Sequence, residues 1–530
     1  MPRETRVVGF GAGNAKSWQT NTSGGTVVVR RLGLVTLAAY VLCAAHIHAD
    51  TLSRDATFGS NGVFKTEIGP HTDSFKGAYG MALQADGKVV LAGVCNGAAE
   101  SDFCLVRLTA AGQFDTTFNG TGSVISPVAA VGAYGRAVAV QADGKIVVAG
   151  ACADVEFDQL CVVRYTAAGA LDTSFNSTGR AVTTFASSGA ETSVANAVAI
   201  QSDQKIVAGG VCNVGGSLMF CIARYNSDGS LDQSFNASAP PDGRGMRVTA
   251  VSTTGSSTAN AILVQPDQKI VQVGACNSAT SPGIRMCALR LNPDGSLDST
   301  FNGSGLLVVA SGDCSVCSEA RAVYIQADGR LLLAGASSEV PSRFVALRLT
   351  ASGGVDSTFG SGGAAAATVG IGFATAFAVT QQVDGRIVLA GTCVDGTTGN
   401  DFCVLRLKAD GSIDLSLGGT GRHVTAVTTG ADNVRAALIQ PDGKLLLGGY
   451  CSLEGATFCA VRYGLSCTMD VDGDGSVLST SDALILTRVS LGMTGNAVIN
   501  GINFPAAATR RTWTAIRDHL ANTCGMALAP

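Results

Sequence analysis

The chain has 530 residues, of which 46% are hydrophobic and 14% are charged, and its formal net charge is −4. This hydrophobic content excludes a disordered chain, and the length exceeds one ordinary domain unless a repeat extends a common core. Aromatic residues are sparse, at 6%, and the charge is mildly acidic, so the basic stripe of a nucleic-acid-binding protein is missing. We therefore expect no nucleic acid among its partners.

Residues 1–49 are predicted to be an upstream extension followed by a secretory signal peptide. Arg30 and Arg31 form a basic start, and residues 32–45 form an apolar run. Cleavage is expected after Ala44, Ala45 or Ala49. The run is shorter than the ~20 residues that cross a bilayer, and a retained N-terminal anchor is the alternative. Removal of this segment leaves 31 basic and 39 acidic residues, a net charge of −8. We expect a secreted, periplasmic or cell-surface protein without stable membrane insertion after cleavage.

Seven copies of one unit fill residues 50–464. A short turn such as "QADGK" marks each copy, and the turns follow one another at steps of 57, 60, 64, 61, 56 and 58 residues. The turn aspartates are Asp86, Asp143, Asp203, Asp267, Asp328, Asp384 and Asp442. The second copy reads as four short strands, "RAVAVQ", "KIVVAGAC", "LCVVRYTA" and "RAVTTF". This pattern predicts an all-β, seven-bladed β-propeller of four-stranded blades, with a β-solenoid as the alternative.

A second regularity predicts how the ring of blades closes. In six copies an Arg of the third strand is followed eight residues later by an Asp. The pairs are Arg107 with Asp115, Arg164 with Asp172, Arg224 with Asp232, Arg290 with Asp298, Arg348 with Asp356, and Arg406 with Asp414. Arg462 in the seventh copy lacks such an Asp, whereas Asp55 has no Arg before it. We therefore expect an N-terminal strand to complete the seventh blade and to place Asp55 beside Arg462. The pairs are interpreted as buried and structural.

These units resemble the delta-60 repeat, a β-propeller repeat of bacterial surface and secreted proteins. The matching stretches are "QADGKIVVAG" at 141–150, "VVRY" at 162–165 and "LDTSFN" at 171–176, and the resemblance extends over residues 52–463. It implies a propeller fold and a surface or extracellular setting. It implies no single activity.

Paired cysteines predict intrablade disulfides in six copies, because one Cys ends the second strand and another stands three residues before the Arg. The pairs are Cys95 with Cys104, Cys152 with Cys161, Cys212 with Cys221, Cys276 with Cys287, Cys393 with Cys403, and Cys451 with Cys459. In the fifth copy Ser337 and Val345 replace both cysteines together, as expected for a bonded pair. There Cys314 and Cys317 predict a small loop disulfide.

Two alternative roles for the cysteines are disfavoured. Zinc is disfavoured because two Cys per blade would leave each metal half-ligated, and only His71, His423 and His519 follow residue 49. A redox pair in "CSVC" is disfavoured because no helix begins there to lower a thiol pKa. Cys467 and Cys524 are predicted to clasp the ends of a C-terminal segment, and sixteen cysteines after residue 49 indicate an oxidising compartment.

The composition changes in residues 465–530, which predict a small α-helical calcium-loop module. The stretch "DVDGDGS" alternates carboxylates before Gly475, which permits the sharp turn that a calcium loop requires. The predicted ligands of one calcium ion are Asp470, Asp472, Asp474, Ser476 through its carbonyl, and Asp482. An amphipathic helix follows, and a second one, "RRTWTAIRDHLANTC", returns along it. A solvated acidic turn is the alternative.

The module resembles a dockerin or one half of an EF-hand, which implies calcium binding. It departs from that pattern because its closing acid, Asp482, stands at loop position 13, and Ser481 occupies position 12. No second Asp-rich loop follows, so the resemblance does not extend to paired docking on a cohesin-type partner.

The leading hypothesis is a secreted or cell-surface, non-catalytic repeat protein that binds an extracellular protein or glycan. We predict that it is not an enzyme, because seven near-identical Arg–Asp pairs cannot each be an active site and no catalytic motif is found. The acids that do not recur, Glu100, Asp102, Glu156 and Asp158, are interpreted as solvated. An extracellular propeller enzyme acting on a polysaccharide or another polymer is one alternative, and a structural envelope spacer is another. The insertion at 236–246 is a candidate recognition lip or a tolerated surface loop.

Overall fold

The computed structural model describes most of the chain beyond residue 51. The described residues are 52–69, 76–97, 101–153, 157–185, 190–240, 243–252, 255–277, 283–310, 314–396, 399–452, 456–465, 471–472 and 480–520. The predicted signal peptide lies outside them. Within the described part, every helix is too short or too polar to span a bilayer.

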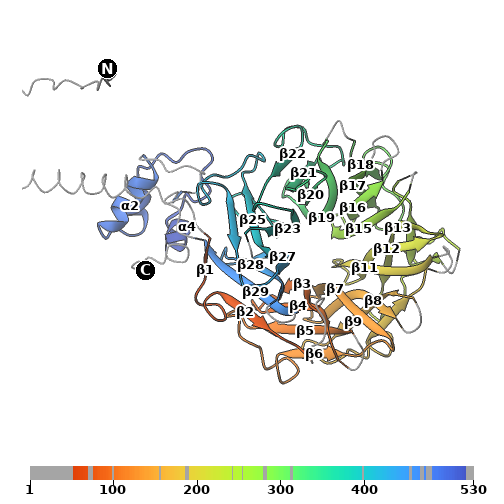
Figure 1. Ribbon diagram of the computed structural model, residues 1–530. Coiled ribbons are helices and arrows are strands. Elements are labelled where there is room, and N and C mark those ends of the chain that lie inside the picture. The colour runs from red at the N-terminus through yellow and green to blue at the C-terminus, as the bar shows by residue number, and fades with distance from the viewer. Residues whose placement is uncertain are drawn as a thin grey trace, which may run out of the picture. The chain divides into compact units, whose positions relative to one another are not determined.

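Seven four-stranded antiparallel blades follow one another around a ring, which confirms the predicted fold class (Figure 1). The innermost strands are β3 (Gly77–Leu83), β7 (Gly132–Val140), β11 (Ala190–Ile200), β15 (Ser257–Val264), β19 (Cys317–Ile325), β23 (Ala374–Gln381) and β27 (Asp432–Ile439). The second strands are β4 (Val89–Cys95), β8 (Ile146–Ala153), β12 (Ile206–Val214), β16 (Ile270–Asn277), β20 (Leu331–Ser337), β24 (Ile387–Val394) and β28 (Leu445–Ser452).

The outer half of each blade completes the sheet. The third strands are β5 (Asp102–Leu108), β9 (Gln159–Tyr165), β13 (Ser217–Tyr225), β17 (Ile284–Leu291), β21 (Phe344–Leu349), β25 (Asn400–Leu407) and β29 (Ala456–Leu465). The outermost strands of blades one to six are β6 (Ser123–Ser126), β10 (Arg180–Thr183), β14 (Met246–Thr249), β18 (Leu306–Val308), β22 (Ala364–Ala367) and β26 (Arg422–Thr425).

The N-terminal segment closes the ring, as predicted. Strand β2 (Val63–Thr66) pairs with β29 as the outermost strand of the seventh blade, and β1 (Leu52–Arg54) pairs with the end of the same strand. The innermost strand of that blade, β27, contacts β3 of the first blade. The two ends of the repeat array therefore share one sheet, and the outer edge of β29 is covered.

The apolar cores lie between neighbouring blades. Strand β8 is buried along its whole length because its two faces pack against different blades. Val147 and Ala149 of β8, for example, belong to the same apolar cluster as Ile206 and Ala208 of β12 in the next blade. Seven such clusters, one per interface, explain why the second and third strands are nearly continuous runs of apolar residues.

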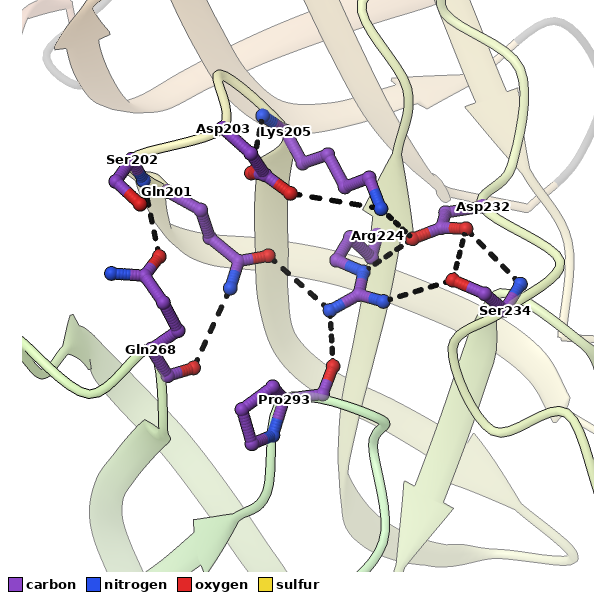
Figure 2. Close-up of polar contacts among 9 residues, drawn as sticks. All are labelled: Gln201, Ser202, Asp203, Lys205, Arg224, Asp232, Ser234, Gln268 and Pro293. Atoms are coloured by element: carbon purple, nitrogen blue, oxygen red, sulfur yellow. Dashed lines mark hydrogen bonds and ion pairs between the residues drawn. The ribbon is translucent and has the colours of Figure 1, made fainter.

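The repeated Arg forms a buried polar link within and between blades, shown for Arg224 in Figure 2. Its Nε lies 2.7 Å from Oδ2 of Asp232, and Nη2 donates to Ser234. Nη1 donates to the carbonyl oxygen of Pro293 in the next blade. Lys205 of the "QSDQK" turn lies 3.0 Å from the same Asp232 carboxylate. The link is structural, as predicted, because each buried charge has a partner.

The structure contains all seven disulfides predicted for the blades, with Cα–Cα distances of 5.5 to 5.9 Å. Six are the intrablade pairs, in which Cys95 bonds to Cys104, Cys152 to Cys161, Cys212 to Cys221, Cys276 to Cys287, Cys393 to Cys403, and Cys451 to Cys459. The seventh joins Cys314 to Cys317. Cys467 and Cys524 lie outside the described residues. Seven disulfides fit a protein of an oxidising compartment.

The two cysteines of an intrablade pair are not directly opposed across their strands. The third-strand cysteine faces a glycine of the second strand in every case. Cys104 faces Gly93, Cys161 faces Gly150, Cys221 faces Gly210, Cys287 faces Gly274, Cys403 faces Gly391, and Cys459 faces Gly449. The second-strand cysteine lies two residues beyond that glycine, on the same face of the sheet, so each bond runs diagonally between the strands.

The fifth blade keeps a disulfide although it lacks the recurring pair. Cys317 of β19 faces Ser337, the residue that replaces the second-strand cysteine. The bond from Cys317 to Cys314 therefore lies one strand closer to the ring axis than in the other blades.

The C-terminal segment contains α2 (Asp482–Ser490), α3 (Asn496–Ile499) and α4 (Trp513–Asp518). Its small apolar core is built from Val471, Ile485, Val489, Val498, Ile516 and Leu520. The two amphipathic helices expected from the sequence thus correspond to α2 and α4.

Candidate ligand-binding site in the central channel

A cavity of about 800 Å³ lies on the ring axis, and residues from all seven innermost strands line it. This volume falls within the ~300–1,000 Å³ that small-molecule sites occupy. The cavity also reaches Val94 and Val211 near the ends of second strands, and Ser101 in a β4–β5 connection. It therefore extends toward the end of the ring that carries the disulfides.

Every innermost strand has a β-bulge, and the bulged residue lines the cavity. In β3, for example, Ala78 faces Gly93 and Gly80 faces Ala92, so Tyr79 is left without an opposed residue. We call these seven residues the bulge ring. They are Tyr79, Arg136, Asn196, Asn260, Arg321, Phe377 and Arg435. A bulge redirects the side chain that it carries, which here brings one residue per blade to the axis.

A glycine in each second strand makes room for the bulge. A Cβ on Gly93 would lie 1.8 Å from the carbonyl oxygen of Gly77, two residues before Tyr79. The same approach occurs at Gly150, Gly210, Gly274, Gly335, Gly391 and Gly449, where the distance is 1.7 to 2.2 Å. The recurring glycine two residues before the first-cysteine position thus shapes the channel.

Side-chain contacts link one arc of the bulge ring. The Arg435 guanidinium lies 4.2 Å from the centre of the Phe377 ring and 5.6 Å from that of Tyr79. Its Nη2 donates to the Tyr450 hydroxyl at 3.0 Å. Arg321, in the blade before Phe377, lies 5.6 Å from the same phenyl ring and pairs with Glu319 at 2.8 Å. This arc combines guanidinium groups with aromatic faces.

The remaining arc is built from amides. Arg136 Nη1 donates to Oδ1 of Asn196 at 2.9 Å. The Nδ2 atoms of Asn196 and Asn260 donate to the backbone carbonyls of Ala259 and Ala320 in the following blades, each at 2.8 Å. These bonds orient both amides, since each donates to a fixed backbone acceptor.

Neighbouring charges act on one another across the channel. Burial raises the pKa of Tyr79, and Tyr450 adds to the rise, whereas the positive charges of Arg435 and Arg136 oppose it. Burial lowers the pKa of Arg136, Arg435 lowers it further, and Tyr79 and Asp158 counteract this. Arg136 and Arg435 thus lie close enough to repel, which an anion between them would relieve.

The sequence-predicted calcium ligands are only partly within the described residues. Asp470, Asp474 and Ser476 lie outside them. Asp472 and Asp482 are both buried, and Oδ1 of Asp482 accepts hydrogen bonds from the backbone N–H groups of Val471 and Asp472. The closing acid at position 13 therefore reaches the start of the loop. Within the described part of the chain, no group of three acidic, His or Cys side chains is placed to hold a metal.

The structure revises the interpretation of one acidic residue as solvated. Asp102 is fully buried in β5 rather than solvated, because it faces Cys95 within the sheet. Asp158 is half-buried, and Glu100 and Glu156 lie outside the described residues. The 236–246 insertion connects β13 to β14 at the outer part of its blade, and none of its described residues lines the channel.

Sequence reasoning missed the bulge ring, although the sequence contains a signal for it. Each member stands seven residues before the turn aspartate of its copy, as Tyr79 does before Asp86 and Arg435 before Asp442. The spacing repeats while the residue type changes. A search for recurring residue types does not detect the bulge ring, because only the spacing to the turn aspartate recurs and the residue itself changes.

Six segments of the chain match the family described as "domain of unknown function (DUF5122) beta-propeller". They are residues 84–118, 141–175, 201–235, 265–301, 326–359 and 382–417. No curated protein is significantly similar to the chain in sequence.

Several solved structures are similar in fold at low identity. Polysaccharide lyase Uly1 is 13% identical with a TM-score of 0.40, and the match covers 79% of this chain and 98% of the lyase chain. A PL25 ulvan lyase bound to -[GlcA(1-4)Rha3S]- is 9% identical with a TM-score of 0.40, covering 73% and 94%. Sqt1 from Chaetomium thermophilum is 9% identical with a TM-score of 0.35, covering 71% and 80%.

The prediction that the chain is not an enzyme is corrected by these comparisons. The structures that the chain resembles include two polysaccharide lyases, and the recurrence of the Arg–Asp pairs gives no ground for excluding catalysis elsewhere in the ring. The physical reason is that activity depends on the residues of a site, and the fold does not determine them. The chain is a seven-bladed β-propeller in which six repeats match the DUF5122 β-propeller family.

Proposed function

We propose that this chain is a secreted, periplasmic or cell-surface protein that binds an extracellular ligand in its central channel. The bulge ring supports this proposal. The Arg–Asp links, the glycines and the turns recur in nearly every blade, as a scaffold requires. The bulge ring brings seven side chains together at the axis, and their residue types differ from blade to blade. Such a loss of symmetry is expected where a repeat scaffold recognises one asymmetric molecule.

The compartment is supported by the disulfides and by the delta-60 resemblance. Seven disulfides are expected of a protein that leaves the reducing cytoplasm. Delta-60 repeats imply a surface or extracellular setting. The proposed ligand is therefore an extracellular molecule.

The cavity volume limits the kind of ligand. About 800 Å³ accommodates a glycan segment or an extended peptide, whereas a folded domain cannot enter. The sequence predicts an extracellular glycan or protein as the partner. We propose that a segment of such a glycan or an extended peptide binds inside the channel.

We also propose that the dockerin-like terminal module binds one calcium ion through Asp470, Asp472, Asp474, Ser476 and Asp482. The chemistry of this set fits calcium, since all five would supply oxygen. The buried Asp482 carboxylate supports the proposal because it holds the start of the loop through two backbone amides. A bound calcium ion would neutralise part of the negative charge that the loop concentrates.

A blocking substitution tests the channel. Thr258 lines the cavity and is half-exposed, so Thr258→Trp fills the channel without entering an apolar core. Leu415→Trp is the matched control, because Leu415 is 60% exposed and does not line the cavity. A panel of extracellular oligosaccharides and short peptides is screened by calorimetry. We expect binding to be lost in Thr258→Trp and retained in Leu415→Trp. Equal binding by both variants would overturn the channel as the site.

A further inference from the structure

The described residues that line the channel include four cationic side chains and no acidic one. The cations are Lys76, Arg136, Arg321 and Arg435. The chain as a whole has a net charge of −4, so this concentration of positive charge is local. A cleft lined by one sign of charge focuses the field on its ligand and selects the opposite sign.

The arginines of the channel differ from those of the blades. Each blade arginine has an Asp carboxylate at 2.6 to 2.9 Å from its Nε. Among the described residues, neither Arg136 nor Arg435 has a carboxylate within 4.0 Å of its guanidinium. A guanidinium in a protein stays charged, so these two groups have a positive charge without a carboxylate of the described residues in direct contact.

Some donors and acceptors of the channel residues also have no hydrogen-bond partner among the described residues. The Nε atoms of Arg321 and Arg435 are buried and have no hydrogen-bond partner among the described residues. The Nδ2 atom of Asn260 is engaged with Ala320, whereas no described residue donates to its Oδ1. The channel therefore offers donors on cationic groups and an acceptor suited to a hydroxyl.

The aromatic residues hold this charge in place. Phe377 contacts both Arg321 and Arg435, and Tyr450 accepts from Arg435, so these contacts restrict the motion of both guanidinium groups. Restricted guanidinium groups lose little conformational entropy when they bind an oxyanion in a fork geometry.

We propose that the channel binds an acidic saccharide, whose carboxylate or sulfate groups contact Arg435 and Arg136 and whose hydroxyls contact Asn260. This inference rests on the proposed function, and it deepens that function by naming the ligand class. The anionic groups match the unneutralised guanidiniums, and the hydroxyls match the amide acceptor. The volume of about 800 Å³ admits several linked sugar rings.

Calorimetry on the full secreted chain tests the proposal with four probes: a galacturonate tetramer, a sulfated chondroitin tetrasaccharide, neutral maltotetraose and sodium sulfate. The two acidic oligosaccharides separate a carboxylate from a sulfate source. We expect at least one of them to bind and maltotetraose not to bind. Raising NaCl from about 50 mM to about 500 mM should weaken the binding, since screening weakens charge pairs.

Two arginine variants locate the contacts. Arg435→Gln and Arg136→Gln should each raise the Kd ten- to hundredfold, because each removes a charge-assisted hydrogen bond. Arg136→Gln keeps the test valid if Arg435→Gln destabilises the aromatic arc, since Arg136 is exposed to the channel. Arg422→Gln on the exposed start of β26 is the matched control and should leave the Kd unchanged.

The outcomes separate this inference from the proposed function. Maltotetraose could bind as tightly as the acidic oligosaccharides, with a Kd unchanged in both arginine variants and with binding lost in Thr258→Trp. That result would overturn the acidic ligand class and would leave the channel as the binding site. If sulfate ion binds as tightly as the acidic oligosaccharides, the channel is a simple anion site and the proposal of a saccharide ligand is overturned. Failure of both acidic oligosaccharides to bind would overturn this inference. The proposed function is tested separately, by the binding of any oligosaccharide or peptide of the extracellular panel in the channel.

Discussion

Arg462 and Asp55 lie 407 residues apart in the sequence and form an ion pair with 2.9 Å between Nε and Oδ2. Arg462 Nη1 also donates to the carbonyl oxygen of Ala110 in the first blade. Lys444 lies 3.1 Å from the same Asp55 carboxylate. The Asp55 carboxylate, near the N-terminal end of the array, thus contacts two cations of the seventh blade. The Arg462–Asp55 pair links the seventh blade to the first, in the same way that the other six Arg–Asp pairs link successive blades.

Removing the Asp55 charge should loosen the closure. Asp55→Asn is expected to lower the free energy of unfolding by about 3 kcal/mol, because it leaves the buried Arg462 with an uncompensated charge. It should also speed the hydrogen exchange of β2 and β29, which hold the two ends of the array together. Asp172→Asn is the matched control, since the same group there lies within a blade whose strands are continuous in sequence. Unchanged exchange of β2 in Asp55→Asn would contradict this role of the pair.

Acid should destabilise the propeller in a defined range. Burial alone would raise the pKa of Asp55, Asp115 and Asp232, but hydrogen bonds from neighbouring hydroxyl and backbone groups together with cationic partners outweigh it and lower each to about 2. A carboxyl whose pKa is lower in the folded state than in the unfolded state stabilises the fold above the unfolded value. That stabilisation, about 2 kcal/mol for each carboxyl, is lost as the pH falls from about 4 to about 2.

Denaturant unfolding across that range measures the effect. The slope of the unfolding free energy against pH should be shallower in Asp115→Asn, since one group that takes up a proton on unfolding is gone. A free energy that stays constant between about pH 4 and about pH 2 would contradict the prediction.

The sequence predicted the scaffold well because the scaffold recurs. The Arg–Asp spacing of eight residues led to the closure by Asp55, and the paired loss of cysteines in the fifth copy led to the disulfides. Lys205 shows what recurrence alone could not explain. The Lys or Arg after each turn aspartate is visible in the sequence, but its approach to the Asp232 carboxylate depends on how two hairpins pack.

The channel was missed for a physical reason. A β-bulge shifts the strand register by one residue, and its direction depends on a close approach of two strands that hydrophobic periodicity does not report. Arg435 and Phe377 come from different blades, so their 4.2 Å contact follows from ring closure and has no local sequence signal. The cysteine pairing likewise proved diagonal, because Gly93 takes the position opposite Cys104.

The glycine that accommodates the bulge gives a direct test of this geometry. Gly93→Ala places a Cβ 1.8 Å from the carbonyl oxygen of Gly77, so β3 and β4 must separate. We expect a loss of more than about 3 kcal/mol in the free energy of unfolding. Gly464→Ala is the control, because no atom lies within 4 Å of its Cβ position and its backbone is not left-handed. Equal stability of the two variants would show that the bulge does not need the glycine.

The disulfides should contribute according to the length of chain that they close. The double variant Cys152→Ala with Cys161→Ala opens a link across nine residues and should cost about 3 kcal/mol in the chain-entropy view. The double variant Cys314→Ala with Cys317→Ala opens a link across only three residues and should cost about 2 kcal/mol. Peptide mapping of the oxidised protein checks the pairing first. A larger loss from the second variant would mean that packing in the fifth blade, and not chain entropy, dominates.

Calcium titration separates the metal role of Asp482 from its structural role. We expect one calcium ion per chain by calorimetry, and no binding in the double variant Asp470→Ala with Asp474→Ala. Asp482→Asn retains an oxygen that accepts from the Val471 and Asp472 amides, so the calcium-free module should remain folded while calcium affinity falls. Asp518→Asn makes the same charge change at an exposed side chain of α4 and should bind as the wild type does. Absence of binding at millimolar calcium would leave Asp482 as a buried loop-closing carboxylate, whose two backbone hydrogen bonds then account for its place at position 13.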